Sequence, residues 1–528
     1  MLSILPFAIL LATSFAMLIL TRSRSRLGLA WMISILAAML TWLGVILLHI
    51  RFPNALVVSN WLPGGISPDV LRLEFTTSTW ILAVCWLGML VCVVAASSAN
   101  LEEPLIGLIL SGSFAIAAVT LLSILSTSLL SFLVAWTLID ITEFVLLART
   151  IPDREMMKTE IIDIAFRIAG TFLVVAALAI SSSSGGGVNL GGTGSETYAL
   201  LIAGAALRMG VLPLHSSFTP DEPVRRTLGT LYRLATLVSA FALLIQLPIS
   251  PLAAGSIWFV YLVSGVAAIF GAVMWATSVN ELSGRQYWAL SLAGMGMLAV
   301  MRGQSNLLIA AACIMIIVGG FLFVIQKRRR NLNFLFVLLL LGASGLPFTP
   351  FSDAWLGDWS YLRVFQIAAL AILLLGAIRF YEKKEEAKVV RETWVTFFSR
   401  VGLIAITLSP WMLMIWKRDF LPLKTGWWYS LILVVFFMAG FFYRMFISRR
   451  LERSDRTMQF TRDMAIAGAR SLRTFFRFDW LLRFLEWVYR QAQQAVQFLE
   501  SVLEGEGGVL WSLVFLALLI SVLASLGK

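Results

Sequence analysis

Apolar residues dominate the chain in runs of about 20, separated by short polar stretches that contain glycine, proline or charged residues. A run of that length matches what an α-helix needs to cross the hydrocarbon core of a bilayer. We therefore expect about 16 membrane-spanning helices. Their approximate ranges are 2–20, 27–50, 79–98, 104–123, 128–148, 161–181, 197–215, 224–247, 253–279, 285–302, 304–326, 332–348, 354–381, 397–418, 426–446 and 509–526.

Two stretches depart from this pattern of long apolar runs. Residues 51–78 contain a Pro-Gly-Gly turn at 63–65, and apolar side chains then alternate from Leu71 to Phe75, which predicts a short external β-hairpin with a structural role. Residues 478–504 place apolar side chains at helical spacing. This second stretch predicts an amphipathic helix that either lies in the membrane interface or braces neighbouring subunits.

One predicted span breaks inside the sequence RMGVLPLHSSFTPDEP (208–223). We expect Arg208 to lie at membrane depth. Gly210 and Pro213 follow it and are the predicted helix breaks, and His215 comes next. Proline removes a backbone donor, and lipid cannot satisfy the backbone groups that are freed. A charge beside a break in an apolar span is typical of an ion or proton path, so we expect the functional site here.

A second span, 332–348, is interrupted at Gly345 and Pro347 and is followed by Asp353. The two breaks lie five spans apart, so the two helices point to opposite sides of the membrane. Paired broken helices of this kind indicate inverted repeats. The predicted fold class is therefore an all-α polytopic membrane protein with two inverted five-helix repeats. Asp353 is a candidate site residue, although it would also suit the N-cap of a helix that starts at Ala354.

These features divide the chain into six segments. The two repeats form the centre, and spans of unassigned role flank them. The segments are the N-terminal spans with the external hairpin (1–103), the first repeat (104–250), the second repeat (251–381), the C-terminal spans (382–448), the basic segment with the amphipathic helix (449–508) and the terminal span (509–528).

Composition and charge agree with a membrane protein and limit its partners. Of the residues, 59% are hydrophobic and only 13% are charged, and the net charge is +12. The positive charge gathers in alternate loops, which predicts an integral membrane protein with both termini outside. We expect its membrane to be a prokaryotic-type inner (cell) membrane. Such a distribution does not indicate nucleic acid binding. The basic segment 444–477 fits an anionic lipid surface.

Cofactor motifs are absent from the sequence. The three cysteines form no CxxC pair, there are only two histidines, and no nucleotide-binding glycine motif follows a predicted strand. We therefore expect no cofactor, no metal and no catalytic chemistry in this chain. Redox chemistry, if the assembly performs it, would belong to other membrane or soluble subunits.

Two carboxylates lie within the span 128–148. Asp140 and Glu143 are three residues apart and share a helix face, where either can pair with a membrane arginine. The alternative is that Glu143 lies at the interface near Arg149 and only Asp140 is deep.

Three further side chains complete the first candidate site. Arg208 and Arg233, the latter in the span 224–247, keep their protons at any useful pH, so they can hold a carboxylate, set a field or gate a path. A structural ion pair of Asp140 with Arg208 is an equally good interpretation. His215 titrates near neutrality, although it could simply bond a backbone carbonyl at a helix end.

Three other charged residues are expected to play no part in this site. Arg167 would extend its side chain to the membrane surface from within the span 161–181. Glu281 and Arg285 flank a loop and would be solvated.

The stretch RMGVLPLHSSFTPDEPVRRTLGTLYRLATLVSA (208–240) resembles the antiporter-like membrane subunits of respiratory complex I and of multi-subunit cation/proton antiporters. The PLH motif of that family is intact at 213–215. ELSGRQYWALSLAGMG (281–296) and GLPFTPF (345–351) are similar to two further motifs. The resemblance implies two inverted five-helix repeats and proton movement along buried charged residues.

The chain also departs from that family. Arginine stands at 208, where the family has lysine, and at 233, where it has histidine or lysine. Trp136 is followed by threonine instead of glutamate, and the carboxylates come later. The resemblance implies a proton- or cation-translocating subunit of a larger complex related to NADH:quinone oxidoreductase. The alternatives are a non-transporting structural paralogue, or a membrane partner of a soluble enzyme as in inorganic-carbon uptake systems.

Overall fold

The computed structural model of the chain describes most of its first 442 residues. It divides into two units, Met1–Met458 and Gln459–Lys528, and the elements discussed below belong to the first. The described residues are 4–21, 27–51, 57–59, 72–97, 105–150, 154–183, 190, 195–212, 226–247, 258–325, 332–355, 361–384, 393–416 and 427–442, with isolated positions 487, 490, 491, 493, 494, 497 and 517.

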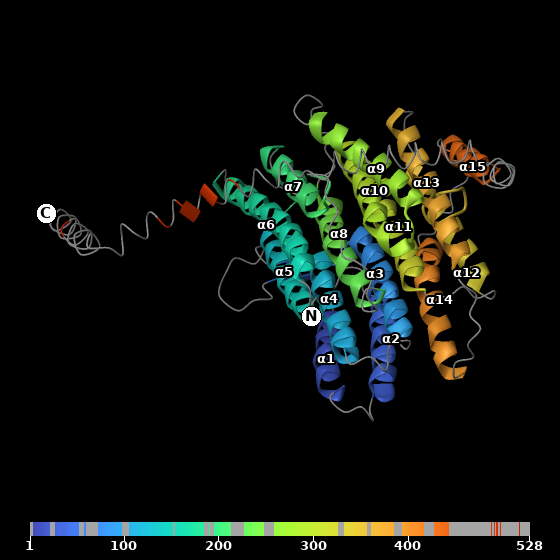
Figure 1. Cartoon of the computed structure of the whole chain (residues 1–528), viewed down its shortest axis with the longest axis horizontal. Helices are drawn as coiled ribbons and strands as arrows, with labels where there is room; N and C mark the ends of the chain where they lie inside the picture. Colours follow the sequence, from blue (N-terminus) through green and yellow to red (C-terminus); the bar gives the residue numbers. More distant parts are fainter. Residues whose placement is uncertain are drawn as a thin grey trace. The chain divides into compact units, whose positions relative to one another are not determined.

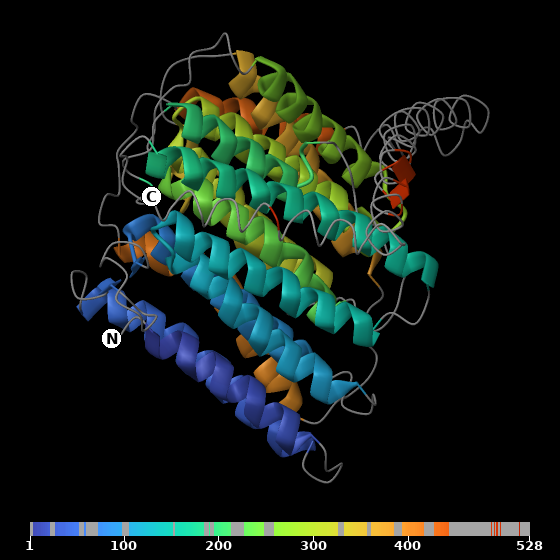
Figure 2. The same ribbon diagram turned by 90° about the vertical axis from the view of Figure 1, so that its left-hand side faces the viewer.

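The described part of the first unit consists of α-helices that lie side by side and two short strands (Figures 1 and 2). The protein is therefore an all-α polytopic membrane protein, as the apolar runs predicted. The helices are α1 (Leu5–Leu20), α2 (Leu27–Arg51), α3 (Thr77–Ala96), α4 (Ile106–Leu125), α5 (Leu129–Thr150), α6 (Arg154–Ser183), α7 (Ser195–Arg208), α8 (Leu228–Gln246), α9 (Trp258–Thr277), α10 (Glu281–Met301), α11 (Ser305–Val324), α12 (Asn333–Ser344), α13 (Tyr361–Lys383), α14 (Thr393–Trp416) and α15 (Trp427–Phe442).

Each of the first fifteen predicted spans overlaps one of these helices, with some ends shifted by up to seven residues. Among the described residues, nine helices are long and apolar enough to cross a membrane by length and composition, and several shorter ones are also apolar. The sixteenth predicted span lies outside the described residues except for Ala517, so the count of 16 stays a prediction. Within 478–504, the six described residues are helical.

The predicted hairpin is present as two antiparallel strands, β1 (Val57–Ser59) and β2 (Arg72–Glu74). Leu73 of β2 also bridges Ser126, and the backbone N–H of Thr127 donates to the Arg72 carbonyl at 3.1 Å. The hairpin is therefore tied to the short connection between α4 and α5.

Two sets of five consecutive helices, α4–α8 and α9–α13, close in the same way. In the first, the side-chain amide of Gln246 at the end of α8 donates to the Ile124 carbonyl at the end of α4, at 3.2 Å. In the second, the indole of Trp275 on α9 donates to the Leu373 carbonyl on α13, at 3.0 Å. In each set the first helix therefore contacts the last, and the division into two inverted repeats stays a prediction.

Both predicted helix breaks among the described residues use a glycine with a left-handed backbone. Gly210 has φ 71° just after α7, and Gly345 has φ 68° at the end of α12. Glycine adopts this conformation without a steric penalty and commonly ends helices. The two helices consequently end earlier than predicted, at Arg208 and Ser344. Pro347 follows the second break, and Pro213 lies outside the described residues.

The expected start of a helix at Ala354 is wrong. Asp353 belongs to η7, a short 3-10 helix at Ser352–Trp355, and α13 begins only at Tyr361. Asp353 therefore does not cap a membrane-spanning helix.

Helices α6 and α7 approach so closely that only glycine fits between them. A Cβ atom at Gly170 would lie 2.6 Å from the Gly204 carbonyl oxygen, and one at Gly204 would lie 2.8 Å from the Gly170 carbonyl oxygen. Arg167 precedes the first glycine by about one helical turn, and Arg208 follows the second by about one turn. The glycine contact thus brings two arginine-bearing helical faces together.

Replacing Gly204 by alanine is expected to lower stability. The added methyl overpacks the α6–α7 contact, which typically costs about 1–3 kcal/mol. Gly44→Ala is the matched control, because a Cβ there meets nothing within 4 Å and alanine favours a helix over glycine by about 0.5–1 kcal/mol. Thermal unfolding of the purified protein in detergent measures both. Equal melting temperatures for the two variants would contradict the packing argument.

Candidate functional site

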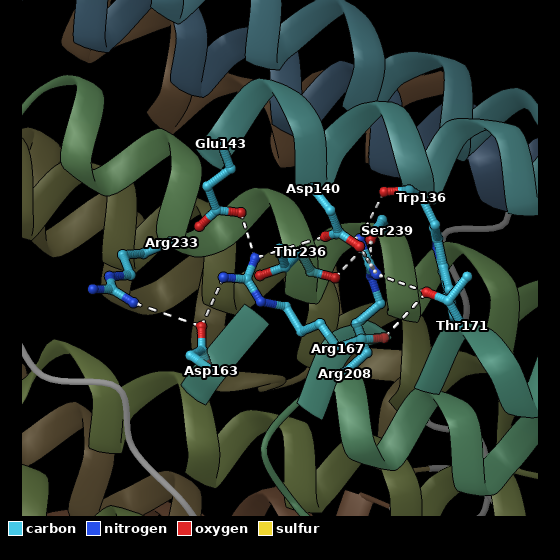
Figure 3. A network of polar contacts seen from close by, with 10 residues as sticks. All are labelled: Trp136, Asp140, Glu143, Asp163, Arg167, Thr171, Arg208, Arg233, Thr236 and Ser239. Carbon is cyan, nitrogen blue, oxygen red and sulfur yellow. Dashed lines mark hydrogen bonds and ion pairs between the residues drawn. The ribbon is translucent and has the colours of Figure 1, made fainter. Parts of the chain in front are cut away.

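Six ionisable side chains from four neighbouring helices form a buried cluster (Figure 3). All lie on the consecutive helices α5–α8, and their formal charges sum to zero. The members are Asp140 and Glu143 on α5, Asp163 and Arg167 on α6, Arg208 on α7 and Arg233 on α8. We call these six residues the charge cluster.

Arg208 is the most completely bonded member of the charge cluster. Its Nη1 and Nη2 donate to the two carboxylate oxygens of Asp140 at 3.0 and 2.8 Å. Nη2 also donates to the Trp136 carbonyl at 3.3 Å, Nε to the Ser239 hydroxyl at 3.3 Å and Nη1 to the Thr171 hydroxyl at 3.5 Å. An arginine has five N–H donors, and each finds an acceptor here. The guanidinium carbon also lies 4.5 Å from the centre of the Trp136 ring.

Arg167 lies between all three carboxylates. Its Nη1 donates to Glu143 Oε2 and lies 3.8 Å from Asp140 Oδ1, and its Nη2 is 2.8 Å from Asp163 Oδ2. Only 2% of Arg167 is exposed, so the expectation that it extends to the membrane surface is wrong. The side chain of Arg167 points into the protein instead, because a buried charge is stabilised chiefly by partners of opposite sign.

Glu143 is buried in the protein like Asp140. It is 1% exposed and Asp140 is 8% exposed, and Glu143 pairs with Arg167. The structural pair of Asp140 with Arg208, left open by the sequence, is present.

Arg233 extends the charge cluster to α8. Its Nη1 lies 3.9 Å from Asp163 Oδ2. Charges of alternating sign therefore follow one another from Arg208 through Asp140, Arg167 and Asp163 to Arg233, with Glu143 at the side of Arg167 (Figure 3).

Two predicted site residues do not join this cluster. His215 lies outside the described residues. Asp353 is partly exposed in η7 and forms no ion pair with another residue of the described ranges. Within those ranges, no group of histidine, cysteine, aspartate and glutamate side chains is arranged to hold a metal ion.

A second ionic group joins the ends of four helices. The carboxylate oxygen Oε1 of Glu281 accepts from Arg226 Nη1 at 2.8 Å and from Lys384 Nζ at 3.1 Å. Arg285, one turn along α10, donates to the Thr230 hydroxyl at 3.0 Å. The expectation that Glu281 and Arg285 are solvated is therefore wrong, since they are only 9% and 7% exposed.

Glu281 and Lys384 lie just outside the predicted spans 285–302 and 354–381. Burial alone would raise the pKa of Glu281, but Lys384 and Arg226 hold it below its ordinary value. Burial lowers the pKa of Lys384 to about 8, against the opposing effect of Glu281. The pair is thus ionised at neutral pH.

Comparison with solved structures places the fold. The chain matches a chain of the Mrp complex from a Dietzia species with a TM-score of 0.59 and 16% identity, over 95% of this chain and 63% of that one. It also matches a chain of the archaeal membrane-bound sulfane sulfur reductase, a respiratory membrane complex, with a TM-score of 0.62 and 13% identity, over 98% and 99%. The chain shares its fold with these two chains of membrane complexes.

The resemblance read from the motifs is thus confirmed at the level of the antiporter-type fold. No protein-family model matches the chain, and no curated protein matches it either. The chain spans 63% of the length of the Mrp chain, and the similarity between the two is one of fold.

Within this antiporter-type fold, sequence reasoning missed several buried charges. Asp163 stands four residues before Arg167 on α6, where both point the same way, and this spacing within an apolar span was a usable signal. Arg226 and Lys384 occur among loop charges, and nothing in their sequence neighbourhood distinguishes them from solvated residues. Only the folded chain brings them to Glu281.

Replacing Arg208 by glutamine is expected to destabilise the protein by about 3–5 kcal/mol, because Asp140 would remain buried without its bidentate partner. Adding Asp140→Asn should restore much of the loss. The exposed Arg149→Gln on α5 is the control. Melting temperatures of the purified variants report the effect, and a cost for Arg208→Gln no larger than that for Arg149→Gln would contradict the pairing argument.

The stability of the parent chain is expected to rise as the pH increases from about 8 towards 10.5, the ordinary value for lysine. In this window the unfolded chain binds a proton at Lys384 that the folded chain has lost, so raising the pH favours folding. Below this window the full cost of burying the ammonium is present. Lys384→Met should lack this particular rise when melting temperature is followed against pH. Identical profiles for parent and variant would show that Lys384 does not titrate as stated.

Proposed function

We propose that this chain is a proton- or cation-translocating subunit of a larger membrane complex related to NADH:quinone oxidoreductase. The observation that carries the proposal is the charge cluster, which lies across α5–α8 and includes the last residue of the broken helix α7. Ionisable residues in membrane-spanning helices are costly, and they typically mark ion paths or proton relays. A break in the helix beside them is the usual way to admit water or an ion.

The charges in the cluster are more numerous than simple packing of helices requires. Replacing buried ion pairs by apolar side chains of similar size is often neutral or stabilising, so such pairs are a poor means of holding helices together. Three acids and three arginines in the same four helices therefore favour a role that needs charge.

Within the cluster the carboxylates differ in how firmly they are held. Asp140 has both oxygens on Arg208, so we assign it the role of a fixed counter-charge. Glu143 and Asp163 share Arg167, and we assign proton exchange to these two groups. Arg208 and Arg233 set the local field, since arginine retains its proton.

Ordered water would complete the proton path. Trp136 Nε1 and Arg167 Nε are buried and have no hydrogen-bond partner among the described residues. Buried polar atoms of this kind usually bond to ordered water. His215, after the first break, and Asp353, after the second, remain proposed members of the path on sequence grounds.

Other membrane subunits are the proposed partners. The two matching chains belong to the Mrp complex and to a respiratory membrane complex. We also propose that the basic segment 444–477 contacts anionic lipid. Both termini are proposed to lie on the external side of the membrane.

A non-transporting structural subunit is the second candidate. It is favoured by the complete bonding of Arg208 and by arginine at all three cationic positions of the charge cluster. In that case the cluster would be a set of fixed ion pairs inside the bundle.

The test is proton flux into proteoliposomes that contain the purified native complex, driven by its electron donor and acceptor. Glu143→Gln is expected to reduce flux to the background rate, since the amide cannot carry a proton. Glu74→Gln, on the half-exposed hairpin pair with Arg72, should leave flux unchanged. Parental flux in an assembled Glu143→Gln complex would favour the structural candidate.

A further inference from the structure

Lys384 differs from the other buried cations in one chemical respect. The cationic side chains that are buried among the described residues are Arg167, Arg208, Arg285, Arg363 and Lys384. Arginine does not release its proton in proteins, whereas a buried lysine does so readily. Lys384 is therefore the member of this set that can change its charge.

The surroundings of Lys384 use all three of its N–H donors. Its Nζ lies 3.1 Å from Glu281 Oε1 and 2.9 Å from the Leu322 carbonyl oxygen, and it also donates to the Ile325 carbonyl. The two carbonyls belong to the end of α11, where backbone acceptors lack helical partners and attract positive charge. The ammonium is thus held by one carboxylate and one helix terminus.

The same carboxylate oxygen also binds the first repeat. Arg226 lies two residues before α8 and after the first break, and its Nη1 lies 2.8 Å from Glu281 Oε1. Glu281 begins α10, and Lys384 follows α13. One oxygen atom therefore joins a residue after the first broken helix to the ends of helices in the second repeat.

We propose that Lys384 is a proton-exchanging residue that couples the two repeats through Glu281. Its ammonium gives a proton to water and becomes a neutral amine, and it regains a proton from water in the reverse step. In the neutral form it no longer attracts Glu281 or the end of α11, and the carboxylate is left to Arg226. This inference rests on the proposed translocating function.

Several charged groups surround Lys384 and set its titration. Glu281 on α10 favours the charged form, and Arg226 before α8 opposes it. Arg285 lies 6.0 Å from the ring centre of Phe323 on α11. The exposed Glu382 and Lys383 precede Lys384 directly, and the basic residues 327–330 follow α11 outside the described ranges. Burial is the largest influence and brings the pKa to about 8, within reach of a working pH.

Lys384→Arg separates the charge of this residue from its proton exchange. The variant retains a cation for Glu281 and for the α11 carbonyls but cannot become neutral. In proteoliposomes with the native complex we expect assembly at the parental level and loss of flux. The parent flux should change with pH near pH 8, and the variant should lack this change. The neighbouring Lys383→Arg is the matched control and should behave as the parent.

The outcomes of this experiment distinguish the two proposals. Parental flux and an unchanged pH profile in Lys384→Arg would overturn the role of Lys384 while the translocating function stands. Absence of flux in the parent complex itself would overturn the proposed function, and with it this inference.

A second measurement needs no variant and decides the matter if Lys384→Arg fails to assemble. Reductive methylation modifies neutral amines, so the yield at each lysine of the intact parent complex, determined by mass spectrometry, follows its deprotonation. Lys384 should reach half of its maximal yield near pH 8, below the exposed Lys383. Half-maximal reaction at or above the value for Lys383, or no reaction at Lys384, would overturn the proposal.

Discussion

The two-fold hydrogen-bonded pair between Arg208 and Asp140 is the interaction on which the first repeat depends. It joins α7 to α5 at the point where α7 ends. Each of the two buried charges compensates the other in apolar surroundings. The glycine contact between α6 and α7 makes the pair possible, because it lets Arg208 approach the carboxylates from the side of Arg167. The charge pairing therefore depends on the backbone packing, because the ion pair can form only when the helices lie in close contact.

The buried charges form two groups that differ in their cations. Towards α8 they alternate in sign through Arg167 and Asp163 and become more exposed, with Asp163 and Arg233 side chains 15% and 12% accessible. Towards α10, the contact is made instead at the helix ends, where Glu281 pairs with Arg226 near the start of α8 and with Lys384 just after α13. The first arrangement keeps its cations permanently charged, and the second contains a lysine. The cations of the first arrangement therefore stay charged, whereas one cation of the second can lose its proton.

The sequence predicted the helices well because each needs about 20 apolar residues, and that requirement is local. The breaks at Gly210 and Gly345 were also predicted, although the predicted spans extended past them to 215 and 348, because a sequence does not show which glycines adopt a left-handed backbone. The pairing of Asp140 with Arg208 could be proposed from chemistry alone. The burial of Glu281 and Lys384 could not, since residues 103 positions apart are brought together only by the packing of α10, α11 and α13.

The complete bonding of Arg208 also limits which residue can take its place. Lysine, which the resembling family carries at this position, offers three N–H donors from a single nitrogen. Arg208 uses five, in a planar fork, to reach Asp140, Ser239, Thr171 and the Trp136 carbonyl. Lysine at position 208 would leave some of these acceptors buried without a donor. A change from arginine to lysine here is therefore not conservative unless the side chains that accept from Arg208 change with it.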